Sequence, residues 1–214
     1  MSASTARTVA RHLLEIEALA FRPDAPATTP GGRTTPLVID GRKLIAHPRL
    51  RRRLVTLAAE QLADNCGIEA FDAVAGAETA GLPLAAWLAD ELMLPMLYVR
   101  KQPKGFGRNA AIEGRLAEAA RVLLVDDVAT DGSSKLAFAD ALRAAGARVD
   151  HALVVCAAGI WPDAERAVRE AGLTLHALTT WRDLAAAARA EAWLPPDLLD
   201  EIDAFLAAPD GAIG

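Results

Sequence analysis

The chain has 214 residues, of which 52% are hydrophobic and 24% charged, a composition that is typical of a folded globular protein and excludes a disordered one. The net charge of −5 and the aromatic content of 5% argue against nucleic acid as the main partner, since acidic residues outnumber basic ones and base-stacking side chains are scarce. No stretch approaches the roughly 18 consecutive apolar residues that a membrane helix needs, so we expect a cytoplasmic protein with no membrane partner.

The first fifth of the chain predicts one helix followed by an irregular segment. Apolar side chains recur at helical spacing over residues 3–19. Residues 21–36 contain four prolines and two adjacent glycines, which predicts an irregular connection. The pattern then predicts a short strand and a long helix, over residues 37–39 and 49–65.

From residue 71 onwards, predicted strands and helices alternate. Short apolar runs predict strands over residues 71–76, 96–99, 122–125, 149–156 and 173–178. Amphipathic segments predict helices over residues 82–91, 136–145, 162–171, 181–192 and 198–207. Such alternation is typical of an α/β fold with a central, mostly parallel sheet flanked by helices.

The cysteines and histidines predict neither a disulfide framework nor a zinc site. Cys66 and Cys156 form no closely spaced pair, and we expect two buried free thiols in a reducing compartment. The four histidines show no ligand spacing, and we interpret them as structural or surface residues, at positions 12, 47, 151 and 176.

The most informative segment runs from Val122 to Ser134. After a buried strand come Asp126 and Asp127, then a hydroxyl-rich loop with one glycine, then a helix. Ligands of α/β sheets lie beyond the carboxyl ends of the strands, and helix N-termini attract phosphate. An Asp-rich turn with a serine N-cap would explain one acid and one serine, but not the pair of acids. The segment therefore indicates a phosphorylated sugar as ligand.

A second unusual segment, residues 101–113, is polar and basic and lies between two predicted strands. Four cations occur in the nine positions from Arg100 to Arg108. A long loop of this kind inside a compact domain is usually functional or mobile, although a solvated basic loop is the simpler interpretation of these charges taken alone.

The segment from Val122 to Ser134 resembles the motif with which type I phosphoribosyltransferases bind 5-phosphoribosyl 1-pyrophosphate (PRPP). The resemblance implies the fold of that family, with a small N-terminal hood. It also implies that Asp126 and Asp127 hold the ribose hydroxyls. The loop of Thr130, Asp131, Gly132, Ser133 and Ser134 would then bind the 5′-phosphate, and Val128 and Ala129 would also belong to the PRPP site. We expect the Asp131 side chain to point away from the phosphate, towards the base or a backbone N–H.

Further segments resemble the orotate phosphoribosyltransferases within that family. The run Gly32-Arg33-Thr34-Thr35-Pro36 is similar to the family's hood over the base, and Ile112-Glu113-Gly114 is similar to the segment that precedes the signature strand. The stretch Ala77, Glu78, Thr79, Ala80 and Gly81 is similar to the loop that binds pyrophosphate. Arg100, Lys101 and Lys104 match the start of the family's catalytic flexible loop.

The resemblance implies a Mg²⁺-dependent transfer of ribose 5-phosphate from PRPP to orotate, giving orotidine 5′-monophosphate and pyrophosphate in pyrimidine biosynthesis. The catalytic residues would be Lys104, Asp126 and Asp127, with Arg100 and Lys101 on the pyrophosphate. Thr130 and Arg33 would bind the base, and Mg²⁺ would be held through PRPP and water, with no direct protein ligand. An arginine that binds the orotate carboxylate in the family has no counterpart in residues 157–161, so Arg33, Arg42 or backbone N–H groups would replace it.

The resemblance also implies a homodimer in which the loop of residues 100–113 reaches the neighbouring subunit's site. We expect a single domain over residues 1–214, with a helix and hood to about residue 47, an α/β core over 48–180 and C-terminal helices over 181–214. Two alternatives stay open: a phosphoribosyltransferase for another base, and a non-catalytic PRPP-binding regulator.

Overall fold

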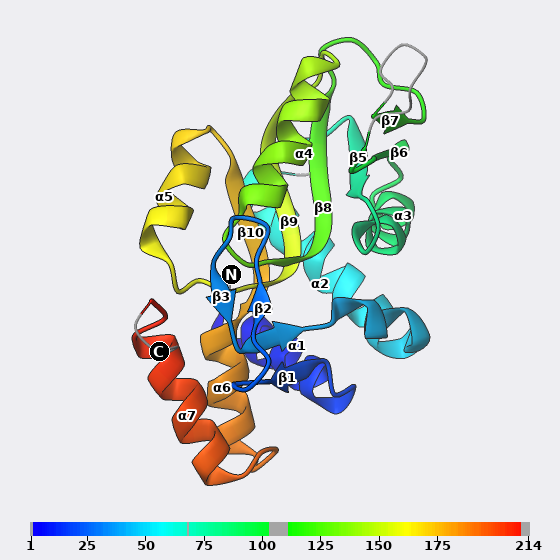
Figure 1. Ribbon diagram of the computed structural model, residues 1–214. Coiled ribbons are helices and arrows are strands. Elements are labelled where there is room, and N and C mark those ends of the chain that lie inside the picture. Colours follow the sequence, from blue (N-terminus) through cyan, green and yellow to red (C-terminus); the bar gives the residue numbers. More distant parts are fainter. Residues whose placement is uncertain (1, 68, 103–110, 211–214) are drawn as a thin grey trace.

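The computed structural model describes residues 2–67, 69–102 and 111–210. Its centre is a six-stranded sheet in the order β10-β9-β8-β5-β6-β7, in which all pairings are parallel except that of β6 with β7 (Figure 1). The strands are β5 (Ala73–Ala77), β6 (Met96–Val99), β7 (Ile112–Glu113), β8 (Arg121–Ala129), β9 (Arg148–Ala157) and β10 (Thr174–Thr180). The α/β prediction with a mostly parallel sheet is confirmed.

Helices cover both faces of this sheet, so the core has two layers. Neighbouring residues of β8 alternate between them: Leu123 packs in the larger apolar cluster and Leu124 in the smaller one. The helices of the first layer are α1 (Ala3–Glu15), α2 (Pro48–Cys66), α3 (Gly81–Glu91), α6 (Trp181–Ala190) and α7 (Pro196–Ala207). The opposite layer contains α4 (Ser133–Ala144) and α5 (Pro162–Glu170). Because β8 is buried on both faces, its central residues are continuously apolar rather than alternating.

The first helix is shorter than the sequence predicts. α1 ends at Glu15, and Glu17 adopts a positive φ of 55° while the Ala18 N–H bonds back to the Leu13 carbonyl, which closes the helix. Leu19 therefore begins β1 (Leu19–Phe21), which pairs antiparallel with β4 (Leu37–Ile39). The prediction of a helix to residue 19 is wrong at this end, because the apolar spacing continues into a strand.

The segment between these two strands is a hairpin rather than an irregular connection. β2 (Ala27–Thr28) pairs antiparallel with β3 (Thr34–Thr35), and together with β1 and β4 they form the hood, which projects from the main sheet (Figure 1). A short 3-10 helix, η1 (Gly41–Ala46), links β4 to α2. The sequence did not reveal the hairpin, because residues 21–36 contain four prolines and strands this short carry almost no periodic signal.

Strand β8 is longer than the sequence predicts. It continues to Ala129, because Asp126 and Val128 still pair with Val154 and Cys156 of β9. Asp126 and Asp127 therefore lie in the last part of a paired strand and not in the loop after it. The predicted strand end at residue 125 is corrected to Ala129. The connection to α4 is then only three residues long, from 130 to 132.

Other expectations about side chains are met in part. Trp161 and Trp181 pack edge to face in the core at 5.9 Å between ring centroids. Both cysteines are free, but Cys66 is only half-buried. Among the described residues, no helix combines the length and apolar character that crossing a bilayer would require.

Candidate active site

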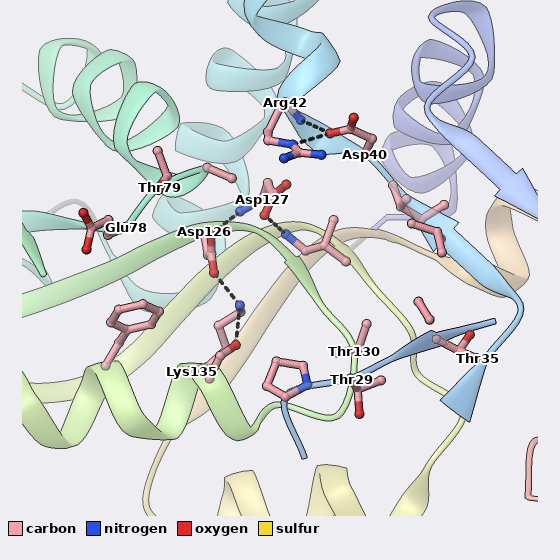
Figure 2. A pocket seen from close by; sticks show the side chains of 18 of the residues that line it. Thr29, Thr35, Asp40, Arg42, Glu78, Thr79, Asp126, Asp127, Thr130 and Lys135 are labelled. Carbon is pink, nitrogen blue, oxygen red and sulfur yellow. Dashed lines mark hydrogen bonds and ion pairs between the residues drawn. The ribbon is translucent and has the colours of Figure 1, made fainter. Parts of the chain in front are cut away.

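A polar cavity of about 410 Å³ lies where β5 and β8 end, beneath the hood (Figure 2). It is bounded on one side by residues 126–134, at the end of β8 and the start of α4, and on the other by the turn after β5. The predicted site residues that line it are Glu78, Thr79, Ala80, Lys101, Asp126, Asp127, Val128, Thr130 and Ser134. Segments far apart in the sequence thus meet at the carboxyl ends of the strands, where α/β sheets bind ligands.

Asp126 forms a buried ion pair with Lys135 on the wall of this cavity (Figure 2). Lys135 lies in the first turn of α4, and its ammonium group also donates to the Ser134 hydroxyl at 3.0 Å. The two residues are only 8% and 3% exposed. Burying a charge without a partner is costly, so each of these groups depends on the other. Lys135 was not predicted to be part of the site.

Asp127 lies beside Asp126 but has no cationic partner of its own among the described hydrogen bonds and ion pairs. One of its oxygens accepts from the Val128 N–H at 2.8 Å, and its N–H donates to Asp126 at 2.9 Å. Burial, followed by the negative charge of Asp126, raises the pKa of the Asp127 carboxyl to about 6. A carboxylate held in this way accepts hydrogen bonds readily from neutral hydroxyl groups.

The loop between β8 and α4 turns sharply at Gly132. This residue has a φ of +76°, and a β-carbon there would approach the Val168 side chain to 2.5 Å. A glycine is needed for both reasons. The turn brings Thr130 and Ser134 to the cavity and presents the N-terminus of α4 to it, an arrangement suited to an anion.

Asp131 points away from the cavity and ties this loop to the hood. Its carboxylate accepts from the Gly31 N–H at 2.8 Å and from the Ser133 N–H and hydroxyl at 3.0 and 2.5 Å. The expected direction towards a backbone N–H is confirmed. A phosphate in the loop would therefore not face the Asp131 charge.

The turn after β5 approaches the cavity closely. Glu78 and Thr79, which are joined by a cis peptide bond, line it together with Ala80. Gly81 begins α3 directly against β8, where a β-carbon would collide with the Val125 carbonyl. Glu78 accepts a hydrogen bond from the Lys101 N–H at 2.7 Å, which links this turn to the segment after β6.

The basic residues that follow β6 come to the same region. Arg100 and Lys101 line a second cavity of about 510 Å³, which shares Pro30, Lys101, Ser134 and Phe138 with the first. Arg100 pairs with Glu113 at 3.4 Å. Lys104, the predicted loop lysine, lies outside the described residues, so its position stays a prediction.

Arg33, the predicted base-binding arginine, has its side chain engaged elsewhere. Its guanidinium pairs with Asp163, lies 3.3 Å from Asp210 and stacks over the Trp161 ring at 5.4 Å, and Arg33 is not among the lining residues of the main cavity. Arg42 does line the cavity and pairs with Asp40 at 2.7 Å (Figure 2). Among the described residues, it is the hood-side arginine that the structure brings to the site.

Comparisons with known proteins agree with this geometry. Residues 43–170 match the family model described as "Phosphoribosyl transferase domain". A protein of Cereibacter sphaeroides named orotate phosphoribosyltransferase is 50% identical over 204 residues, covering 95% of this chain and 88% of its own length. The chain belongs to the orotate phosphoribosyltransferase family.

Two further matches support the same assignment. A Ruegeria sp. orotate phosphoribosyltransferase is also 50% identical, over 95% of this chain and 90% of its own length. The crystal structure of orotate phosphoribosyltransferase from Aeropyrum pernix superposes with a TM-score of 0.70 at 30% identity, over 87% of this chain and 99% of that one. The expected family, its fold and its enzymatic class are therefore confirmed. Orotate phosphoribosyltransferases transfer ribose phosphate from PRPP to orotate, so the alternatives of another base and of a regulator are disfavoured.

Proposed function

We propose that this chain transfers ribose 5-phosphate from PRPP to orotate with the residues described above in specific roles. The observation that carries the proposal is one cavity that brings together two acids, an anion-binding helix N-terminus and a second polar turn. These groups would bind the ribose hydroxyls, the 5′-phosphate and the diphosphate, respectively.

In the proposed complex, Asp127 accepts hydrogen bonds from the ribose hydroxyls, and Asp126 does so while held by Lys135. The negative charge of the pair stabilises positive charge that develops at C1′ as the diphosphate leaves. The loop of residues 130–134 binds the 5′-phosphate through N–H groups and hydroxyls. No covalent nucleophile is required, because positioning and electrostatics lower the barrier.

The diphosphate would lie between the turn of residues 77–81 and the basic residues after β6. Lys101 already lines the cavity, and Arg100 lies beside it. Lys104 would complete the set of cations as the catalytic lysine. Each cation favours departure of the diphosphate because its charge meets the charge that grows on the leaving group.

For the base, we propose Thr130 and Arg42 as the contacts nearest to orotate. Both line the cavity, and Arg42 is mostly exposed, so its guanidinium has room to turn from Asp40 towards a carboxylate. Arg33 would act on the base only by leaving Asp163 and Asp210, and we therefore place it as a residue that fixes the hood.

The residues fit a Mg²⁺ ion held mainly by the substrate. The cavity offers oxygen donors on Asp127 and Glu78, the hard ligands that Mg²⁺ prefers, whereas Asp126 and Asp40 are already paired with cations. Asp127 and Glu78 would hold the ion through water. When bound, it supplies positive charge beside the diphosphate.

A direct assay tests this function. Orotate consumption is followed by absorbance with PRPP and Mg²⁺ present together and with each omitted, and uracil, adenine and hypoxanthine are offered as competing bases with pyrophosphate release as readout. Of the four bases, we expect turnover only with orotate, and only when PRPP and Mg²⁺ are both present. Faster pyrophosphate release with a purine would overturn the assignment of the base.

We also propose a homodimer in which Lys104 acts in the neighbouring subunit's site, and mixing of inactive variants tests it. Lys104→Ala and Asp127→Asn chains are each expected to be nearly inactive. Unfolded together and refolded, half of the chains pair as heterodimers, in which one site has both an intact Lys104 and an intact Asp127. Recovery of activity towards a quarter of the wild-type value supports the shared site, and no recovery in a mixture shown to contain heterodimers contradicts it.

A further inference from the structure

Three side chains that the sequence leaves unconnected meet near the opposite end of the strands from the active site. Cys66 is the last residue of α2, and His151 and His176 lie near the starts of β9 and β10. In the parallel register His151 pairs with Thr174 and His176 with Leu153, so the two rings project from the same face of the sheet, diagonally adjacent. The sequence predicted these histidines only as structural or surface residues and gave no sign that the two meet.

The three potential ligand atoms lie within 4.8 Å of one another. Cys66 Sγ is 3.8 Å from His151 Nδ1 and 3.5 Å from His176 Nε2, and the two nitrogens are 3.0 Å apart. Around a tetrahedral zinc ion with ordinary bond lengths, a sulfur and a nitrogen lie about 3.6 Å apart and two nitrogens about 3.3 Å apart. The observed triangle is close to that geometry on all three sides.

The surroundings also suit a metal ion. His176 is buried, whereas Cys66 and His151 are half-exposed, so an ion could enter from solvent and keep one water as fourth ligand. His151 is fixed in orientation by the Phe71 ring, which meets it edge-on at 5.6 Å. A site with thiolate and imidazole ligands favours zinc, whereas Mg²⁺, the ion that the active site would use, prefers oxygen ligands.

We propose that Cys66, His151 and His176 form a zinc-binding site with one thiolate and two imidazole ligands. Binding releases the thiol proton to solvent, and each ring binds through its facing nitrogen with its proton on the other one. The ion would join the end of α2 to β9 and β10. The site lies near the amino-terminal ends of these strands, whereas the active-site acids lie near the carboxyl end of β8. The expected role is therefore structural, and orotate turnover should not require zinc.

Metal titration of the whole chain tests the proposal. The purified protein is stripped with a chelator and titrated with Zn²⁺ against a chromophoric competitor, and bound metal is counted by mass spectrometry after dialysis. We expect roughly one zinc per chain for the wild type and none for Cys66→Ser or His176→Gln. Cys156→Ala and His47→Gln, which change a cysteine and a histidine away from the cluster, are the matched controls and should bind like the wild type.

Cobalt substitution and thermal melting distinguish a metal site from a metal-free cluster of hydrogen-bonded side chains. Co²⁺ in the wild type should give a thiolate-to-cobalt charge-transfer band that is lost in Cys66→Ser. Zn²⁺ should raise the melting temperature of the wild type but not that of Cys66→Ser, because only the native wild type binds the ion. Zinc binding no tighter in the wild type than in Cys66→Ser would overturn the proposal and leave a hydrogen-bonded thiol and histidine pair. Cys66→Ser alone is sufficient for this decision if His176→Gln fails to fold.

Discussion

Lys135 places its buried ammonium group on the carboxylate of Asp126, nine positions earlier in the chain. The pair joins the first turn of α4 to the end of β8 and fixes one of the two acids that would hold the ribose. The loop between them can therefore be polar and hydroxyl-rich without losing its shape.

Replacing Lys135 with Met should lower the free energy of unfolding by about 3–5 kcal/mol, because Asp126 is left buried and uncompensated. Urea unfolding measures this loss, and the Michaelis constant for PRPP should rise in parallel. Adding Asp126→Asn to Lys135→Met should restore much of the stability but not the activity. Lys101→Met, at an exposed position, is the control and should change stability by less than about 0.5 kcal/mol. A Lys135→Met protein as stable as the wild type would contradict the structural role of the pair.

Asp127 should make PRPP binding dependent on pH. Its pKa is raised to about 6 by burial and by Asp126, so the carboxylate that accepts the ribose hydroxyls is lost as the pH falls below that value. Titration calorimetry between about pH 5 and 8 should show affinity falling by up to tenfold for each unit below 6. Asp127→Asn should bind PRPP weakly and lack this component of the pH dependence, and an equal profile in both proteins would contradict the assignment.

The same raised pKa predicts the effect of Asp127 on stability. The folded protein holds this proton more tightly than the unfolded chain, whose aspartate has a pKa of about 3.9. The stabilising contribution of the protonated group is therefore complete below about pH 4 and is lost as the pH rises through about 6. At neutral pH, Asp127→Asn should accordingly be more stable than the wild type by about 1–3 kcal/mol while nearly inactive. Thermal melts of both proteins at acid and neutral pH measure the difference, which should vanish at the acid end.

Asp131 should couple the hood to the phosphate loop. Replacing it with Ala removes the acceptor for the Gly31 and Ser133 N–H groups and should cost about 1–3 kcal/mol of stability. The Michaelis constants for PRPP and orotate should both rise, because loop and hood move apart. Asp163→Ala, which removes only an exposed partner of Arg33, should cost less than about 1 kcal/mol. Steady-state kinetics in which Asp131→Ala resembles Asp163→Ala would show that the link has no functional role.

Gly132 should tolerate no side chain, for two separable reasons. Gly132→Ala meets both an unfavourable positive φ and the Val168 side chain, whereas Gly146→Ala, at φ +100° with nothing within 4 Å, meets only the first. The backbone component should cost about 1–2 kcal/mol at either site, so the excess at Gly132 measures crowding. Adding Val168→Ala to Gly132→Ala should reduce that excess, and equal losses of unfolding free energy at the two glycines would contradict the crowding.

The sequence was most informative where its signals are local. The run from Val122 to Ser134 predicted a strand, an anion-binding loop and a helix, because an apolar run, a glycine and a helix start are read from adjacent residues. It was least informative in the hood, whose strands have two or three residues and are held by partners elsewhere in the chain. The end of β8 was misplaced for the same reason, since its last residues are strand only because β9 pairs with them.

The sequence by itself determined the fold class, the family and the segments that would contact a phosphorylated sugar. Periodicity and short motifs can be recognised without knowing which distant residues are in contact. Only the tertiary structure decided that Lys135 pairs with Asp126, that Asp131 binds Gly31, that Arg33 turns to Asp163, and that Cys66 meets two histidines. Each of these contacts depends on where separate elements cross or pack. Such positions are set by the whole sheet and its helices, and no spacing along the chain encodes them.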